Sequence, residues 1–199
     1  MEYFCDSESY LDRAKACLGK NEPQYLFYAA FELRCFVESR QHDYLEAQEK
    51  YRKSLPSRWK IGKQSAELRR IFNLDKIQKI TSTFEDGLQF VGLYVPVSKS
   101  LKNHAERLGK LLHAREGSLS EQEFGETRTW LGKMLDHAGE CQSGNMLSPV
   151  LYDKSTQKSI GAMTITLEHH KAHEFTHRAR VGALMMAKVE YVDFETELP

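Results

Sequence analysis

The sequence predicts an α+β fold that is mainly α: an antiparallel helical bundle with a β-hairpin insertion and a small C-terminal β unit. Three observations predict it. Apolar residues recur at helical spacing through most of residues 7–140, the period changes to two at 79–97, and strand-like alternation returns after Ser148. A chain of 199 residues, 41% of them hydrophobic, is long enough to bury one core of this kind.

Three helices are expected before the hairpin. Residues 7–19 gather their apolar side chains on one face, which is typical of a short amphipathic helix. Pro23 suits the first turn of a second, longer helix over about 23–52. The segment "GKQSAELRRIFNL", residues 62–74, supplies a third and shorter helix.

The hairpin is predicted at about 79–97, in "KITSTFEDGLQFVGLYVPV". This stretch is rich in β-branched and aromatic residues, and Asp86-Gly87 stands between two apolar runs. An Asp-Gly pair in that position favours a tight turn between antiparallel strands.

Two core helices should follow the hairpin. In "SKSLKNHAERLGKLLHAREG" the leucines lie at helical spacing and Gly117 is a stop signal. The next helix begins with Ser120 and Glu123, whose spacing is that of a capping box.

The C-terminal part is predicted to be a separate β unit. Residues 149–168 read as two alternating segments about a polar turn, and 181–195 ends in β-forming residues. The resulting division is a helical domain over 1–147 and a β appendage over 148–199, which could dock a protein partner.

The bulk composition points to an intracellular protein, and we expect no cofactor. No segment is apolar enough to span a bilayer, and the acidic N-terminus lacks the pattern of a signal peptide, so we expect a cytoplasmic location without membrane contact. The four cysteines show no CxxC spacing and read as reduced, mostly buried thiols. The formal net charge is zero, which does not indicate a generally polyanion-binding surface.

One block of the chain is strongly basic. Residues 50–70 hold eight Lys or Arg against the single Glu67. We interpret the block first as a solvated surface, and a nucleic-acid contact is the alternative.

The motif "HEFTH", residues 173–177, matches the H-E-x-x-H pattern of zinc enzymes. That pattern requires a helix, so that two histidines one turn apart face the same metal. The preceding residues Met163, Ile165 and Leu167 alternate like a strand, and a strand would hold His173 and His177 roughly 13 Å apart. We therefore expect no metal site here, with His173 and His177 as weak candidates only.

Two segments resemble the HEPN (higher eukaryotes and prokaryotes nucleotide-binding) superfamily. They are "YLFYAAFELRCFVESRQHDYL", residues 25–45, and "AERLGKLLHA", residues 105–114, and the resemblance covers about 7–140. It implies a HEPN-like antiparallel helical bundle that usually dimerises. Many members are metal-independent ribonucleases of toxin and phage-defence systems.

The resemblance also implies a site. The family's arginine and histidine match Arg107 and His113, with His113 as general acid or base and Arg107 orienting the phosphate. The dimer would bring two such pairs around one scissile phosphate, and an imidazole with a guanidinium suits cleavage of RNA by its own 2′-hydroxyl. Leu108 departs from the polar residue that active members often carry after the arginine. Five neighbouring side chains are tentative substrate contacts: Lys102, Lys110, Arg115, Glu32 and Arg34.

The sequence thus suggests three functions. The first is a HEPN-like, metal-independent endoribonuclease or RNA-binding effector of a bacterial toxin or phage-defence system, acting as a homodimer. The second is a non-catalytic dimerising adaptor, in which Arg107 is a surface residue and His113 a helix-end histidine favourably placed against the helix dipole. The third is a zinc hydrolase that uses the "HEFTH" motif.

Overall fold

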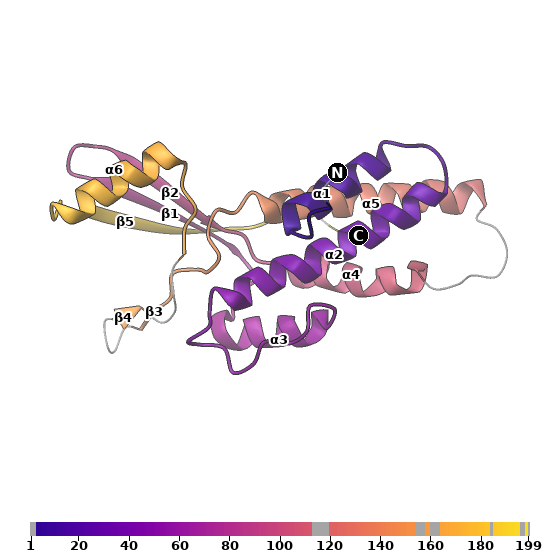
Figure 1. The fold of residues 1–199 in the computed structure, drawn as a ribbon, viewed down its shortest axis with the longest axis horizontal. Coiled ribbons are helices and arrows are strands. Elements are labelled where there is room, and N and C mark those ends of the chain that lie inside the picture. Colours follow the sequence, from indigo (N-terminus) through magenta and orange to yellow (C-terminus); the bar gives the residue numbers. More distant parts are fainter. Residues whose placement is uncertain are drawn as a thin grey trace.

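The chain folds as α+β with a helical end and a sheet end. A computed structural model describes residues 3–112, 120–153, 158–159, 164–183, 185–195 and 198. The described residues form six helices and a small three-stranded antiparallel sheet, and helix is the main element. Figure 1 shows α1, α2, α4 and α5 running alongside one another, with α3 beneath them and the sheet extending to the left of the bundle.

The first three helices lie where the sequence predicts them. Helix α1 spans Ser7–Leu18, capped by Asp6, whose carboxylate accepts a 2.8 Å hydrogen bond from Ser9 N. Helix α3 spans Ile61–Phe72. Helix α2 spans Gln24–Glu46 and is shorter than expected, because its buried apolar stripe ends at Leu45 and residues 47–60 form turns and loop.

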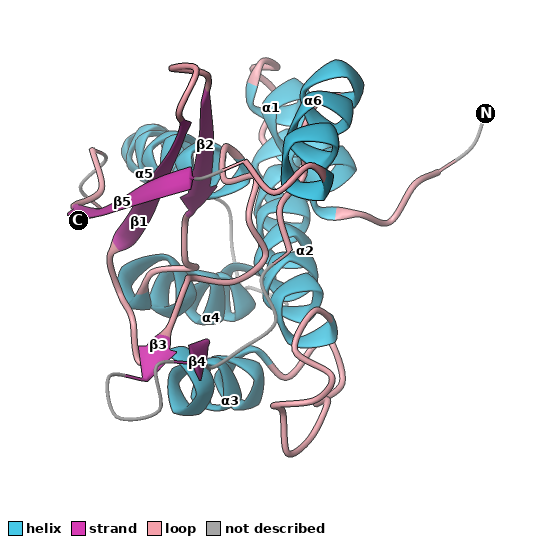
Figure 2. Ribbon diagram, turned by 90° about the vertical axis from the view of Figure 1, so that its left-hand side faces the viewer, coloured by secondary structure: helices cyan, strands magenta, loops and turns pink. Residues whose placement is uncertain are grey.

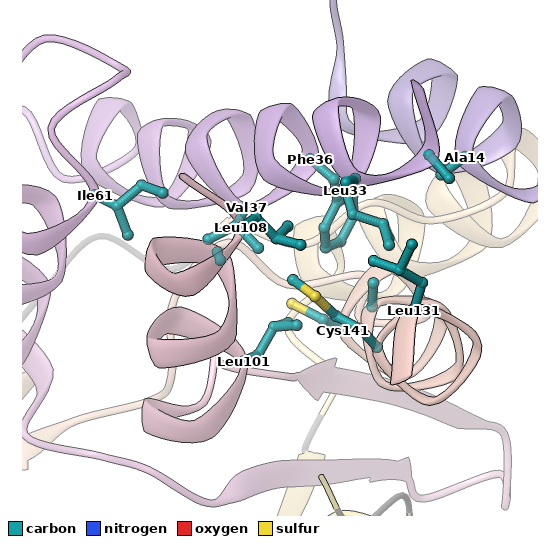
Figure 3. Packing of buried hydrophobic residues seen from close by; sticks show 14 of the residues in the cluster. Ala14, Leu33, Phe36, Val37, Ile61, Leu101, Leu108, Leu131 and Cys141 are labelled. Atoms are coloured by element: carbon teal, nitrogen blue, oxygen red, sulfur yellow. The ribbon is translucent and has the colours of Figure 1, made fainter. Parts of the chain in front are cut away.

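Helices α4 (Lys99–Leu112) and α5 (Glu121–Gln142) complete the bundle. The expected capping box is present, since Ser120 and Glu123 exchange hydrogen bonds with each other's backbone N–H. One buried stripe on α4 meets side chains of α2 and α5 (Figure 3). The fully buried residues at this junction are Leu33, Phe36, Val37, Leu101, Ala105, Leu108, Leu131, Met134 and Cys141.

The sheet has the strand order β2-β1-β5 and is antiparallel throughout. The hairpin prediction is confirmed by β1 (Ile77–Phe84) and β2 (Gln89–Tyr94). Gly87 has φ +83°, a left-handed conformation that a side chain would strain. Strand β5 (Met185–Val192) pairs with the full length of β1.

The prediction of a separate C-terminal β unit is wrong. Strand β5 joins the sheet of the hairpin, so a boundary between residues 147 and 148 divides strands of one sheet. Outside that sheet, the described residues form one pair of two-residue strands, β3 (Tyr152–Asp153) and β4 (Lys158–Ser159), and an isolated bridge between Met146 and Ile165.

Helix α6 (His169–Arg180) occupies the segment expected to be strand. Its Phe175 ring packs edge-on against Phe84 and Phe90 at centroid distances of 5.8 and 5.2 Å, so α6 lies beside β1 and β2 (Figure 2). The Arg178 guanidinium also donates to the carboxylate of Asp86, 2.7 Å away in the hairpin turn. A tertiary aromatic contact thus outweighs the local alternation that suggested a strand.

A buried guanidinium joins the bundle to the sheet. Arg40 of α2 donates through Nη2 to the carbonyl oxygens of Gly144 (2.8 Å) and Cys141 (3.3 Å), at the C-terminal end of α5. Its Nε donates to the Tyr44 hydroxyl at 2.9 Å, and that hydroxyl donates to Val95 O, just after β2, at 2.5 Å. Burial raises the pKa of Tyr44 well above its ordinary value, so the hydroxyl keeps the proton that it donates.

The segment after α5 closes the outer edge of β2. A Cβ on Gly144 would lie 3.0 Å from Leu93 O, so this close approach requires glycine. The Asn145 side chain accepts from Leu93 N at 2.7 Å, and Met146 N donates to Leu93 O at 3.0 Å. These bonds satisfy backbone groups that an edge strand would otherwise leave open.

None of the helices in the described residues combines the length and apolar character that crossing a bilayer requires. The four cysteines are free thiols, but only Cys141 is fully buried and Cys5 is exposed, so the expectation of mostly buried thiols is wrong.

We predict that Tyr44→Phe lowers the free energy of unfolding by about 1–3 kcal/mol, because Val95 O and Arg40 Nε both lose a buried partner. Urea denaturation followed by circular dichroism measures the change. Tyr28→Phe is the matched control, since Tyr28 is 55% exposed and should shift stability by less than about 0.5 kcal/mol. Equal stabilities of the two variants would show that the hydroxyl of Tyr44 does not stabilise this junction.

Candidate nucleic-acid interface

Arg107 is an exposed cation held over an aromatic ring. Leu101, Ala105 and Leu108 turn the buried face of α4 towards the core, which leaves Arg107 on the outside. Its guanidinium carbon lies 5.3 Å from the centre of the Trp130 ring on α5. No carboxylate in the described part of the chain forms an ion pair with it, so its N–H donors remain available to a phosphate.

Trp130 is fixed in place by a buried histidine. Its Nε1–H donates to Nδ1 of His104 at 2.7 Å, which requires that Nδ1 carry no proton. His104 is buried on α4, so this bond ties α4 to α5 directly beneath Arg107. The indole ring therefore has one orientation, and Arg107 has a rigid surface to rest on.

An open groove runs beside this ring along α5. It measures about 380 Å³ and is lined by Gly125, Glu126, Thr129, Trp130 and Lys133. A side chain at Gly125 would meet nothing within 4 Å, so the groove is open at that point. An aromatic ring that contacts Arg107 and lines a groove with Lys133 has the components of a site that stacks a base and pairs with phosphate. Glu126 is the one charge in the lining that opposes a polyanion.

Leu108, the departure from the family pattern, is fully buried in the bundle core. A polar side chain there would have to be buried among Leu33, Val37 and Leu101. Leucine at this position is therefore explained by packing.

Arg34 reaches α4 on a different flank from Arg107. Its Nε pairs with Glu38 one turn along α2, at 2.9 Å. Its Nη1 would lie only 3.0 Å from a Cβ on Gly109, so the glycine in "ERLGKLLH" lets α2 approach α4 closely. Since 107 and 109 are two residues apart on a helix, the two arginines lie on nearly opposite sides of α4.

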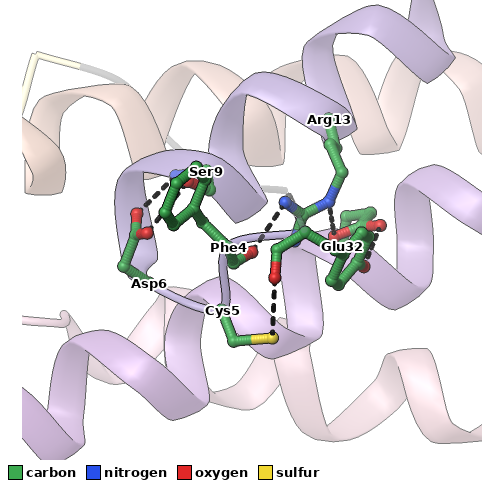
Figure 4. A network of polar contacts seen from close by, with 7 residues as sticks. Phe4, Cys5, Asp6, Ser9, Arg13 and Glu32 are labelled. Carbon is green, nitrogen blue, oxygen red and sulfur yellow. Dashed lines mark hydrogen bonds and ion pairs between the residues drawn. The ribbon is translucent and has the colours of Figure 1, made fainter. Parts of the chain in front are cut away.

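Glu32 and Lys102 have other partners. The Glu32 carboxylate is buried and accepts from Arg13 Nε at 3.0 Å and from the Tyr3 hydroxyl at 3.2 Å (Figure 4). It therefore fastens α1 and the N-terminal segment to α2. Lys102 pairs with Glu106 on its own helix at 2.8 Å. The structure thus does not bring Glu32, Arg34, Lys102 and Arg107 into one groove.

Three of the predicted site residues cannot be placed. His113 and Arg115 lie outside the described residues, and so does the side chain of Lys110.

The basic block forms an ordered surface on α3 and the preceding loop. Glu67 holds the loop by accepting hydrogen bonds from Lys53 N and from Arg70, while Arg70 Nη2 also donates to Tyr51 O at 2.7 Å. These bonds leave the remaining side chains facing outward. The exposed cations are Lys50, Lys53, Arg58, Lys63, Arg69 and Arg70.

An exposed tryptophan stands within this basic surface. Trp59 is 64% exposed, and the Lys60 ammonium lies 4.9 Å from the centre of its ring. Arg69 of α3 and Lys99 of α4 line one small cavity, so the basic surface continues from α3 to the first turn of α4. The sequence indicates the positive charge of this block, whereas the exposure of Trp59 is seen in the structure.

The "HEFTH" motif lies on a helix, so our expectation of a strand there was wrong. His173 and His177 are one turn apart on α6 and both are exposed, which is the spacing that one metal requires of a ligand pair. Within the described ranges, however, no three His, Cys, Asp or Glu side chains converge as a metal site would require. The pair alone does not make a zinc hydrolase.

Comparison with known proteins leaves the family open. No protein-family model matches the chain, and neither curated proteins nor solved structures gave a match. Its function has to be inferred from its own residues and contacts.

We predict that the order of the basic loop depends on the charge of Glu67. The hydrogen bonds from Arg70 and from Lys53 N lower its pKa from 4.5 to about 2. A depressed carboxyl pKa contributes stability above the unfolded value, and that contribution is lost as the pH falls from about 4.5 towards 2. Wild type should therefore unfold at higher urea than Glu67→Gln at neutral pH, and the difference should disappear over this acid range. A difference that is the same at all pH values would contradict the assignment.

Proposed function

We propose that this chain is a HEPN-like, metal-independent endoribonuclease or RNA-binding effector of a toxin or phage-defence system. The observation that carries the proposal is the exposed guanidinium of Arg107, supported by Trp130 and without an ion-pair partner among the described residues. A phosphodiester is the ligand that such a cation beside an aromatic ring suits best.

The basic surface of α3 supports the same ligand. Its cations greatly outnumber its acids, and Trp59 offers a ring on which a base of a single strand can stack. A neutral chain with its charge gathered in this way attracts RNA locally, although its total charge would not.

Cleavage would use Arg107 and His113. One imidazole removes the proton of the 2′-hydroxyl, whose oxygen then attacks the adjacent phosphorus, and the departing 5′-oxygen receives a proton. Arg107 offsets the negative charge that grows on the phosphate oxygens. A homodimer would supply two histidines, so that one acts as base and the other as acid.

The adaptor is the second candidate, and one observation favours it. Several apolar side chains of β5 are exposed, including Met186 at 78% and Tyr191 at 57%. An exposed apolar strand is a surface that commonly contacts another protein chain.

The catalytic proposal predicts that the purified protein cleaves RNA in EDTA. His113→Ala should lower the rate by about 10²–10⁴-fold, and Arg107→Ala by roughly 10²-fold. His170→Ala and Arg180→Ala are matched controls, because both residues are exposed on α6, away from α4. Absence of cleavage, or equal rates in all four variants, would leave the adaptor as the better account.

RNA binding can be tested separately from cleavage. We expect Trp59→Ala to weaken binding of a single-stranded RNA oligonucleotide about tenfold, because one base loses its stacking partner. Fluorescence anisotropy of a labelled oligonucleotide at fixed salt measures the affinity. Tyr28→Ala removes an aromatic residue of similar exposure (55%) from α2 and should leave the affinity unchanged. If both variants bind like wild type, the surface around Trp59 does not contact RNA.

A further inference from the structure

Strand β5 is an open edge of the sheet. The other edge, β2, is covered by the segment from Gly144 to Met146, whereas no strand in the described parts of the chain pairs with the outer side of β5. Every second backbone N–H and C=O of an edge strand points outward and can pair with another chain. The sheet therefore offers one free edge, at the end of the molecule away from the bundle (Figure 1).

Apart from Lys188 and Glu190, this edge lacks the features that usually prevent pairing. β5 is eight residues long, contains no proline, and keeps an unbroken register against β1 from Met185 to Val192. Much of its side-chain surface is apolar and exposed: Met185, Met186, Val189, Tyr191 and Val192 are each at least 41% exposed. Natural edge strands of this length are normally shortened, bulged or given isolated charges.

The two charges on β5 are complementary to a second copy of the same strand. Lys188 and Glu190 lie on one face of the sheet, two residues apart, with Val189 between them. Within one chain their side chains pair at 2.8 Å, and the same two charges can exchange partners with a second strand. A two-fold axis normal to the sheet places residues of the same face opposite each other, so the axis must pass through a residue. An axis at residue 188 would oppose two lysines, and one at 190 would oppose two glutamates.

An axis through Val189 opposes unlike charges and sets apolar residues against apolar residues over 186–192. It sets Lys188 of each copy opposite Glu190 of the other, and Met186 opposite Val192. On the other face, Val189 meets Val189 and Ala187 meets Tyr191. We propose that two copies of this chain pair through β5, antiparallel and centred on Val189, to form a continuous six-stranded sheet.

This contact is independent of the proposed RNA site. It uses the sheet end, whereas Arg107 and Trp130 belong to the bundle. Helix α6 packs its Phe175 on β1 and β2, so the aromatic contact that anchors this helix does not involve β5.

The test is a charge-exchange series followed by sedimentation velocity. Wild type should dimerise at ~0.1 mM or below. Lys188→Glu and Glu190→Lys should each weaken the dimer about tenfold or more, because each replaces two attractive cross-strand pairs by repulsive ones. The double variant K188E/E190K should recover most of the affinity that each single variant loses, because opposite charges again face each other across the axis, although position 190 then places a lysine opposite Lys79 of β1. Lys171→Glu, the same charge change on exposed α6, should have no effect.

Circular dichroism on each variant checks that it is folded, which is expected since Lys188 and Glu190 side chains are 72% and 40% exposed. Three outcomes would overturn the proposal. One is a wild-type chain that stays monomeric, another is single variants that dimerise as well as wild type, and the third is a folded double variant that remains as weak as the single ones. RNA cleavage by these variants is measured separately, so the β5 dimer and the RNA site can each be contradicted without the other.

Discussion

The buried guanidinium of Arg40 is the constraint on which the arrangement of bundle and sheet depends. Arg40 forms no direct ion pair with any described residue, so burying its charge requires that its donors be satisfied by neutral acceptors. These are the carbonyls of Cys141 and Gly144 and the Tyr44 hydroxyl. Carbonyls at the end of α5 suit a cation, since they carry the negative end of the helix dipole. Because Tyr44 also bonds Val95, the same charge fixes α2, α5 and the end of β2 relative to one another.

That junction decides which edge of the sheet is open. With Gly144 held by Arg40, the chain leaving α5 must run along β2, where Asn145 and Met146 bond the backbone of Leu93. The free edge is then left to β5, the last strand in the described part of the chain. The covered and open edges thus follow from one buried side chain rather than from the strands themselves.

Local sequence patterns predicted the elements that short-range contacts stabilise. They did not predict the elements that depend on contacts between residues far apart in the sequence. Asp86-Gly87 and the Ser120 capping box act within four residues, so the hairpin and the start of α5 were predictable. The two carbonyl partners of Arg40 lie 101 and 104 residues away in the sequence, so no local spacing predicts these hydrogen bonds. For the same reason α6 was missed, because its Phe175 is held by Phe84 and Phe90 of the hairpin. In the site, Arg107 was singled out, but Trp130 read as one more apolar residue of a core helix.

The position of the two proposed contact regions constrains how copies of this chain can assemble. Pairing through β5 uses a two-fold axis at the sheet end, and a catalytic pair built around Arg107 would need a second two-fold axis at the bundle end. A chain that uses two different two-fold contacts at once cannot form a closed dimer. It forms a ring or an open row of molecules. If only β5 pairs, each dimer presents two separate Arg107 and Trp130 sites, far from the axis, and these can bind RNA without sharing one phosphate. Dimerisation through the sheet and a shared active site in the bundle are therefore distinct properties, and a simple dimer can possess only one of them.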